Sequence, residues 1–189
     1  MGRKRVRAWV MTYLAEKNRP DERTGVRAEA RAHGIEFRRL KALGEPLCCD
    51  MLAYWNEVRG SRAMPHPREM DPVKFARHMP NLLMIQVNWQ PFDLTYRLLG
   101  GDIVNAHGTN FRGRRILESR SHTGHFNDVL YSFYKFVAEE RRPYAVGGTM
   151  EYVARGPVSV EAVYLPLSLD GTRTDRILGA SVSRKRPER

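Results

Sequence analysis

The histidines are the first candidates in this chain for binding a metal or a cofactor. His107 follows the glycine pair Gly100–Gly101, and its neutral imidazole could serve as an axial haem ligand. It could equally cap a short helix or hydrogen-bond a carbonyl group. His122 and His125 stand three residues apart at a predicted helix start, and a shared metal-binding face is the alternative to a purely structural role. Two ligands without a third nearby do not make a zinc site, and no metal site is predicted.

The cysteines are limited to an adjacent pair, Cys48 and Cys49. Adjacent cysteines rarely bond to each other, so the sequence predicts no disulfide framework. No Cys or His cluster with ligand spacing accompanies the pair, which argues against a metal site. The simplest interpretation is a helix start with one buried thiol, and it fits a reducing compartment.

Enzyme signatures are absent from the sequence. It contains no Walker loop, no Rossmann glycine fingerprint after a strand, no HExxH motif and no nucleophile elbow. No catalytic residue is therefore predicted, and we do not expect the chain to be an enzyme.

The net charge of +11 would indicate a nucleic-acid-binding protein if it lay on the folded domain. Residues 1–45 hold 12 basic and 6 acidic side chains, a net of +6, and residues 184–189 hold 4 and 1, a net of +3. Residues 46–183 hold 16 and 14, a net of only +2. The basic charge thus lies on the flanks, where flexible ends bind polyanions weakly and without reading their sequence. Weak nucleic-acid contact through the N-terminal extension is left open.

The chain shows no sign of a membrane segment. No apolar run approaches the ~18 residues of a membrane span, and the basic start MGRKRVR with its apolar AWVMTYL lacks a small-residue cleavage site. We expect a cytoplasmic protein without a membrane partner.

Its 189 residues favour one domain with appended segments. These are a basic, partly disordered or loosely helical extension (1–45), the domain (46–183) and a charged tail (184–189).

Apolar periodicity predicts three main helices and five strands in that domain. Helical spacing is found over residues 47–59, 72–79 and 126–140. Strand-like runs are found over residues 81–89, 94–99, 144–154, 158–169 and 176–183. Because two strands precede a block of helices and three strands follow it, we expect an α+β fold with an antiparallel sheet. Ser121 or Thr123 is expected to cap the longest helix.

Residues 93–115 form the stretch around which this domain is organised. Tyr96 and Leu98 alternate with polar residues as on a half-buried strand, which the glycine pair at 100–101 ends. Asp102 is then expected to cap a short helix that Gly108 closes.

Arg97 lies in the middle of that predicted strand, out of phase with Tyr96. Its expected role is structural, an ion pair with Glu151 or Glu161 on a neighbouring strand. Anion binding is the alternative, which a buried contact between Arg97 and a carboxylate would exclude.

The order of these elements resembles the PAS fold, and the chain is similar to a proteobacterial family of stand-alone PAS domains. The strand end TYRLLG at residues 95–100 resembles the family's Phe/Tyr-x-Tyr-Arg-Leu-x-Gly pattern. A helix ending in Tyr54–Trp55, an Asp71–Pro72 helix start and a Gly-Arg turn at 113–114 match other parts of it. The resemblance covers roughly residues 47–183. It implies a five-stranded antiparallel sheet with short helices on one face and an extra N-terminal helix.

A PAS-like fold also implies a pocket between the inner face of the sheet and the short helices. The candidate lining residues are Tyr96, Leu98, Ile103, His107, Phe126, Leu130, Phe133, Met150 and Tyr164. The alternative is that these side chains fill the core at native packing density. No cofactor is assigned. Haem and flavin are considered, and flavin photochemistry is disfavoured because Cys48 and Cys49 lie far from the pocket helices in the sequence.

The function implied by the resemblance is a non-catalytic sensory, ligand-binding or protein-interaction domain in bacterial signalling. Its output would pass through a partner protein or a dimer rearrangement. Trp55, Met51 and Leu52 form the predicted dimer surface, unless they cover the domain's own sheet. Two alternatives stay open: a structural adaptor without a ligand, and a basic-tailed protein associated with nucleic acid.

Overall fold

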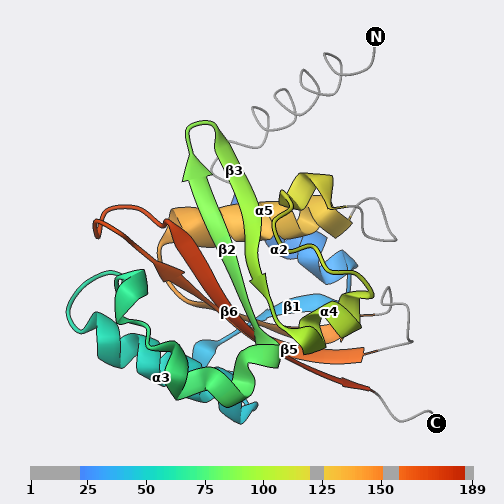
Figure 1. The fold of residues 1–189 in the computed structure, drawn as a ribbon. Helices are drawn as coiled ribbons and strands as arrows, with labels where there is room; N and C mark the ends of the chain where they lie inside the picture. The colour runs from blue at the N-terminus through green and yellow to red at the C-terminus, as the bar shows by residue number, and fades with distance from the viewer. Residues whose placement is uncertain (1–21, 120–125, 151–157, 186–189) are drawn as a thin grey trace.

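An antiparallel sheet of six strands forms the centre of the molecule (Figure 1). This computed structural model describes residues 22–119, 126–150 and 158–185. From one edge to the other, the strands are β1 (Ile35–Arg38), β4 (Tyr144–Met150), β5 (Val158–Leu167), β6 (Arg176–Lys185), β2 (Leu82–Trp89) and β3 (Phe92–Leu99). Every neighbouring pair is antiparallel, which confirms the predicted α+β class.

Helices cover both faces of this sheet (Figure 1). On the face that we name the inner face lie α2 (Glu22–Ala32), α4 (Gly101–His107) and α5 (Phe126–Glu140). The opposite, outer face is covered by α3 (Pro46–Arg59). The short 3-10 helices are η1 (Leu40–Ala42), η2 (Pro67–Glu69), η3 (Pro72–Asn81) and η4 (Ile116–Glu118). None of the helices in the described part of the chain is long and apolar enough to cross a bilayer.

Alternate side chains of the strands supply two separate apolar cores. On β5, Ala162 and Tyr164 belong to the inner core with α5, whereas Val163 and Leu165 belong to the outer core with α3. Because successive side chains of a strand point to opposite faces, a strand that is apolar along its length contributes to both cores. The predicted helices at 47–59, 72–79 and 126–140 correspond to α3, η3 and α5.

The sixth strand, β1, is not predicted from the sequence, so the expected five-stranded sheet is one strand short. β1 has four residues, too few to show a strand period, and it lies in the segment assigned to the extension. It packs against β4 where glycines leave room. A Cβ on Gly148 would collide with the carbonyl oxygen of Gly34, and one on Gly147 with the Arg38 guanidinium. Residues 151–154 of the predicted fourth strand and the caps Ser121 and Thr123 lie outside the described residues.

A β-bulge in β3 changes the face that its side chains reach. Ile85 pairs with Tyr96 and Met84 with Leu98, so Arg97 is the extra residue. Tyr96 belongs to the inner core, but Leu98 packs against the outer core. The alternation that placed both side chains on one face is therefore wrong beyond Arg97.

The glycine at position 100 is the N-cap of α4, where Asp102 was the predicted cap. A Cβ on Gly100 would collide with the Met79 carbonyl oxygen, so this close crossing requires glycine. Asp102 instead accepts a hydrogen bond from Asn81 Nδ2 at 3.0 Å. Gly108 closes α4 in the left-handed region with φ of 72°, as predicted.

Glu161 on β5 joins three segments through a buried carboxylate. It accepts hydrogen bonds from Arg38 Nη1 at 3.0 Å and from the backbone N–H groups of Gly44 and Glu45 at 2.9 and 2.7 Å. These two N–H groups directly precede α3, so the carboxylate lies at the positive end of that helix. β1, α3 and the middle of the sheet are thereby held at one point.

Arg97 does not form the predicted ion pair with Glu161. Glu161 pairs with Arg38, while Arg97 is exposed on the edge strand β3, with β6 and β2 between the two positions. The second predicted partner, Glu151, lies outside the described residues. Anion binding by Arg97 stays a prediction.

The Glu161→Gln variant should lower the free energy of unfolding by about 1–3 kcal/mol, because the amide loses the charge that faces Arg38 and one acceptor oxygen. Urea-induced unfolding measures this loss. The matched control is Glu36→Gln on β1, whose exposed ion pair with Arg31 spans 3.7 Å; we expect a change below about 0.5 kcal/mol. Equal losses in the two variants would contradict the role of Glu161.

Candidate functional site

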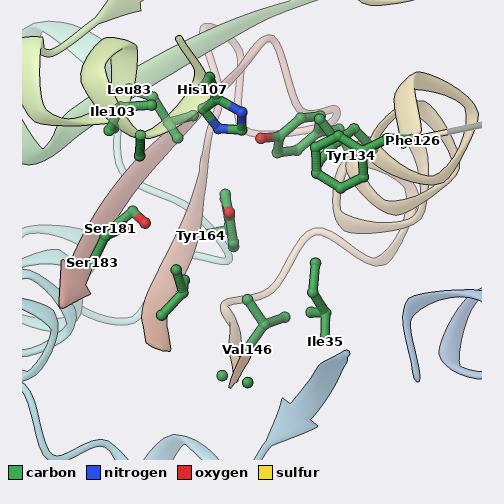
Figure 2. Close-up of a pocket in the computed structure, with 15 residues that line it drawn as sticks. Ile35, Leu83, Ile103, His107, Phe126, Tyr134, Val146, Tyr164, Ser181 and Ser183 are labelled. Carbon is green, nitrogen blue, oxygen red and sulfur yellow. The ribbon is translucent and has the colours of Figure 1, made fainter. Parts of the chain in front are cut away.

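A small cavity lies between the inner face of the sheet and helices α4 and α5. Its volume is about 50 Å³. Figure 2 shows His107 near Tyr164 and Tyr134, with Ser181 on the neighbouring strand β6. The lining residues are Ile35, Leu83, Ile103, Ala106, His107, Phe126, Leu130, Tyr134, Val146, Gly147, Gly148, Val160, Tyr164, Ser181 and Ser183.

Several of the predicted pocket residues come together around this cavity. Ile103 and His107 are four residues apart on one face of α4, and Phe126 and Leu130 are likewise four apart on α5. Tyr164 of β5 lines the cavity from the sheet. Helical spacing in the sequence therefore locates the helical part of the lining. Ligand binding by these residues stays a prediction.

The other predicted pocket residues lie elsewhere. Tyr96 is buried in the inner core away from the cavity lining, and Phe133 packs edge-on against the Tyr164 ring with 4.8 Å between centroids. Leu98 is turned to the outer face by the bulge in β3. The side chain of Met150 lies outside what the structure describes.

The sequence reasoning missed the hydroxyl groups of the lining, Ser181 and Ser183. Both lie on β6 in phase with Ile177, an inner-core residue, so the period of two along this strand was the signal that could have found them. Ile35 could not have been found in this way, because it belongs to the unpredicted strand β1.

His107 brings an uncharged imidazole to the cavity from the last residue of α4. Its ring stacks on Phe126 with 6.2 Å between centroids and 25° between planes. The ring of His33 contacts the same phenyl group, with centroids 6.4 Å apart. Burial lowers the pKa of His107 below its ordinary value, so the neutral form prevails at neutral pH.

Tyr164 contributes an uncharged phenol. Burial raises the pKa of Tyr164 to about 12, and a hydrogen bond with Tyr134 opposes the rise. Together with the serine hydroxyls and the aliphatic lining, these groups give the cavity walls without net charge. About 50 Å³ is enough for water or a molecule of a few heavy atoms.

Haem and flavin do not fit this cavity. Pockets that enclose larger ligands measure about 300–1,000 Å³, and this cavity measures about 50 Å³. In the described part of the chain, no three His, Cys, Asp or Glu side chains gather as a metal-binding group. His122 and His125, the pair considered for a metal, lie outside the described residues.

The residues predicted for a dimer interface cover the chain's own sheet. Trp55 and Met51 are buried in the outer core, and Trp55 Nε1 donates to the Pro166 carbonyl oxygen at 2.8 Å. Leu52 is half-buried beside them. The prediction therefore has to be corrected for Trp55 and Met51, whose side chains are not exposed to a partner.

One cysteine of the adjacent pair is buried and the other is exposed, as predicted. Cys48 is fully buried against β5 and β6, and Cys49 is exposed. Burial raises the pKa of the Cys48 thiol to about 12, so this thiol stays protonated and unreactive in the folded chain.

The pH dependence of stability should report the burial of His107. Below about pH 6.5, the ordinary imidazole pKa, the unfolded chain takes up a proton that the folded chain binds less readily. Wild-type stability should therefore fall as the pH drops below that value, and His107→Gln should lose part of this dependence. Unfolding free energies measured from about pH 8 to about pH 5 test this. Parallel curves for the two proteins would contradict it.

Comparison with protein families agrees with the observed fold. The family model described as PAS domain matches residues 45–182, from the start of α3 into β6. A search of curated proteins found no match. The family match spans more than half of the chain and contains α4, α5 and most of the cavity lining. PAS domains are in general sensory or interaction domains without catalysis of their own. The chain belongs to the PAS domain family.

Proposed function

We propose that this chain is a non-catalytic sensory or protein-interaction domain of bacterial signalling, whose output passes to a partner protein or through a dimer rearrangement. The observation that carries the proposal is the double role of β5 and β6. Tyr164 and Ser181 line the inner cavity, while Val163 and Ala180 of the same strands pack against α3. A shift of these strands at the cavity would therefore move the contact surface of α3.

The ligand that best suits the inner cavity is small and uncharged. Its walls combine an apolar majority with the His107 imidazole, the Tyr164 phenol and two serine hydroxyls. A charged ligand would be buried there without a countercharge, which is unfavourable. The proposal is thus a neutral molecule of a few heavy atoms with one or two polar groups.

A structural adaptor without any ligand is the second candidate. The small volume of the cavity favours it, because side chains already fill most of the space between α5 and the sheet. Weak nucleic-acid contact through the basic extension remains a further proposal, supported by the charge distribution alone. A cytoplasmic location is also still a proposal, supported by the two free cysteines, which suit a reducing compartment.

Native mass spectrometry tests the cavity. We expect the wild-type chain to carry a small added mass that disappears on denaturation. Ser181→Val should abolish this mass, because it replaces a lining hydroxyl by methyl groups and fills part of about 50 Å³. The matched control is Ser159→Val, an exposed position on β5 that should retain the ligand.

The other outcomes separate the candidates. Equal native and denatured masses per chain in the wild type would favour the adaptor. A ligand retained by Ser181→Val would contradict binding in the inner cavity. The same native spectra give the number of chains in the assembly.

A further inference from the structure

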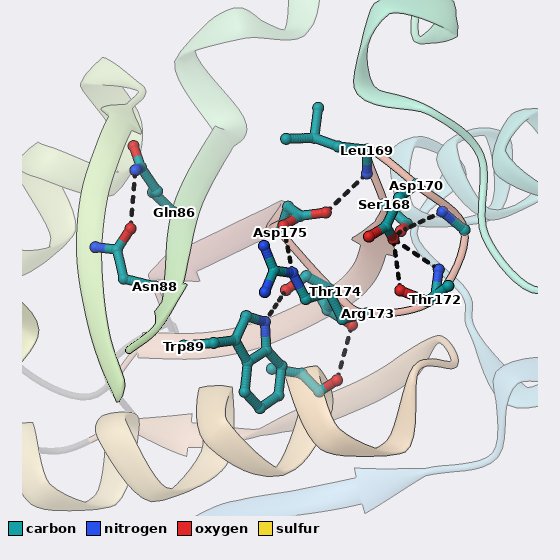
Figure 3. A network of polar contacts seen from close by, with 12 residues as sticks. Gln86, Asn88, Trp89, Ser168, Leu169, Asp170, Thr172, Arg173, Thr174 and Asp175 are labelled. Carbon is teal, nitrogen blue, oxygen red and sulfur yellow. Dashed lines mark hydrogen bonds and ion pairs between the residues drawn. The ribbon is translucent and has the colours of Figure 1, made fainter. Parts of the chain in front are cut away.

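A second hollow lies on the outer face, between the end of β2 and the loop at residues 168–175. Figure 3 shows side chains from both of these segments. We name this hollow the outer groove. Its volume is about 350 Å³, within the range of about 300–1,000 Å³ found for small-ligand pockets. The lining residues that matter here are Gln86, Asn88, Leu169, Arg173, Asp175 and Arg176.

The two walls of the outer groove are fixed to each other. In the loop, the Asp170 carboxylate accepts hydrogen bonds from the Thr172 N–H and hydroxyl groups, both at 2.8 Å. Thr174 is buried, and its hydroxyl donates to the Ala138 carbonyl oxygen of α5 at 2.7 Å. Trp89 Nε1 on β2 donates to the Thr174 carbonyl oxygen at 2.8 Å. A preformed groove of this kind loses little entropy when a ligand binds.

Both oxygens of Asp175, the one carboxylate of the lining, already have partners within the loop. Asp175 Oδ2 accepts a hydrogen bond from the Leu169 N–H group at 2.8 Å, and Oδ1 pairs with Arg173 Nε at 3.4 Å (Figure 3). The charges of Asp175 and Arg173 therefore balance each other across the loop.

Arg176 leaves one positive charge without a countercharge. It is half-buried at the start of β6, opposite Gln86 in the strand register. Its guanidinium donates to the Met84 sulfur at 3.8 Å, and a thioether is a weak acceptor. No carboxylate in the described part of the chain forms an ion pair with Arg176. A partly desolvated cation in this state is stabilised by an anion that enters the groove.

Polar and apolar groups beside Arg176 limit the class of anion. Gln86 Nε2 donates to Asn88 Oδ1 at 3.1 Å, so the Asn88 Nδ2 group keeps its N–H donors for a ligand. Leu169 is 54% exposed at the rim and offers an apolar surface. Two arginines and one aspartate give the lining a net charge of +1, which matches a singly charged group better than a phosphate dianion.

We propose that the outer groove binds a small organic monocarboxylate. Its carboxylate pairs with the Arg176 guanidinium and accepts from the Asn88 amide, and its hydrocarbon body lies against Leu169. The outer groove and the inner cavity are on opposite faces of the sheet, so this site does not depend on the function proposed for the cavity.

Benzoate is the probe, and benzamide is its uncharged counterpart of the same shape. Titration of the 15N-labelled full chain should give saturable shifts for the Trp89 indole N–H, the Asn88 side-chain amide and the Leu169 backbone N–H. Benzamide and inorganic phosphate should bind at least tenfold more weakly. Equal affinity for benzamide, tighter binding of phosphate, or an absence of saturable shifts would overturn the proposal. Shifts confined to Ser181 and Tyr164 would place the ligand in the inner cavity and would overturn it too.

Arg176→Gln should weaken benzoate binding at least tenfold, since it removes the cation but keeps a polar side chain. Arg112→Gln removes the same charge from an exposed loop outside the groove and should leave the affinity unchanged. Thermal unfolding of both variants checks that they are folded. Equal affinities of the two variants for benzoate would overturn the assignment of Arg176.

Discussion

The buried carboxylate of Glu161 is the contact on which the arrangement of the outer face depends. It collects the Arg38 guanidinium and the N–H groups that precede α3 at one point on β5. Glu45 then forms a bidentate ion pair with Arg184 of β6, both distances being 2.7 Å. The start of α3 is thereby fixed to two adjacent strands. Loss of the Glu161 carboxylate would leave several donors without an acceptor, which costs more than the bonds themselves contribute.

Apolar periodicity in the sequence predicts those helices and strands that bury the same face along their whole length. It fails where contacts between residues far apart in the sequence determine the structure. α5 buries Phe126, Phe133 and Val137 at helical spacing, so its core face is readable directly. β1 is fixed by the space over glycines of β4, more than a hundred residues away in the chain. Leu98 is misplaced because one extra residue, Arg97, inverts the phase of β3, and no residue type announces the bulge.

The sheet separates two environments of different polarity. The inner cavity is small and has uncharged walls, whereas the outer groove is larger, more polar and has a net positive lining. β6 contributes to both, with Ser181 on the inner face and Arg176 on the outer face. Periodicity located the helical side of the cavity. The groove was not predicted, because its lining joins the end of β2 to a loop far along the chain.

The bulge at Arg97 also bears on how this sheet can meet other chains. Beside it, the Gly113 N–H group donates to the Tyr96 carbonyl oxygen at 2.7 Å, and the Tyr96 N–H group donates to the Arg114 carbonyl oxygen at 3.0 Å. The middle of the open side of β3 is thus bonded already, and the bulge twists the rest away from a regular strand partner. At the other edge, β1 has four residues. Edge-to-edge growth into a continuous sheet, the first step of fibril formation, is therefore disfavoured at both ends.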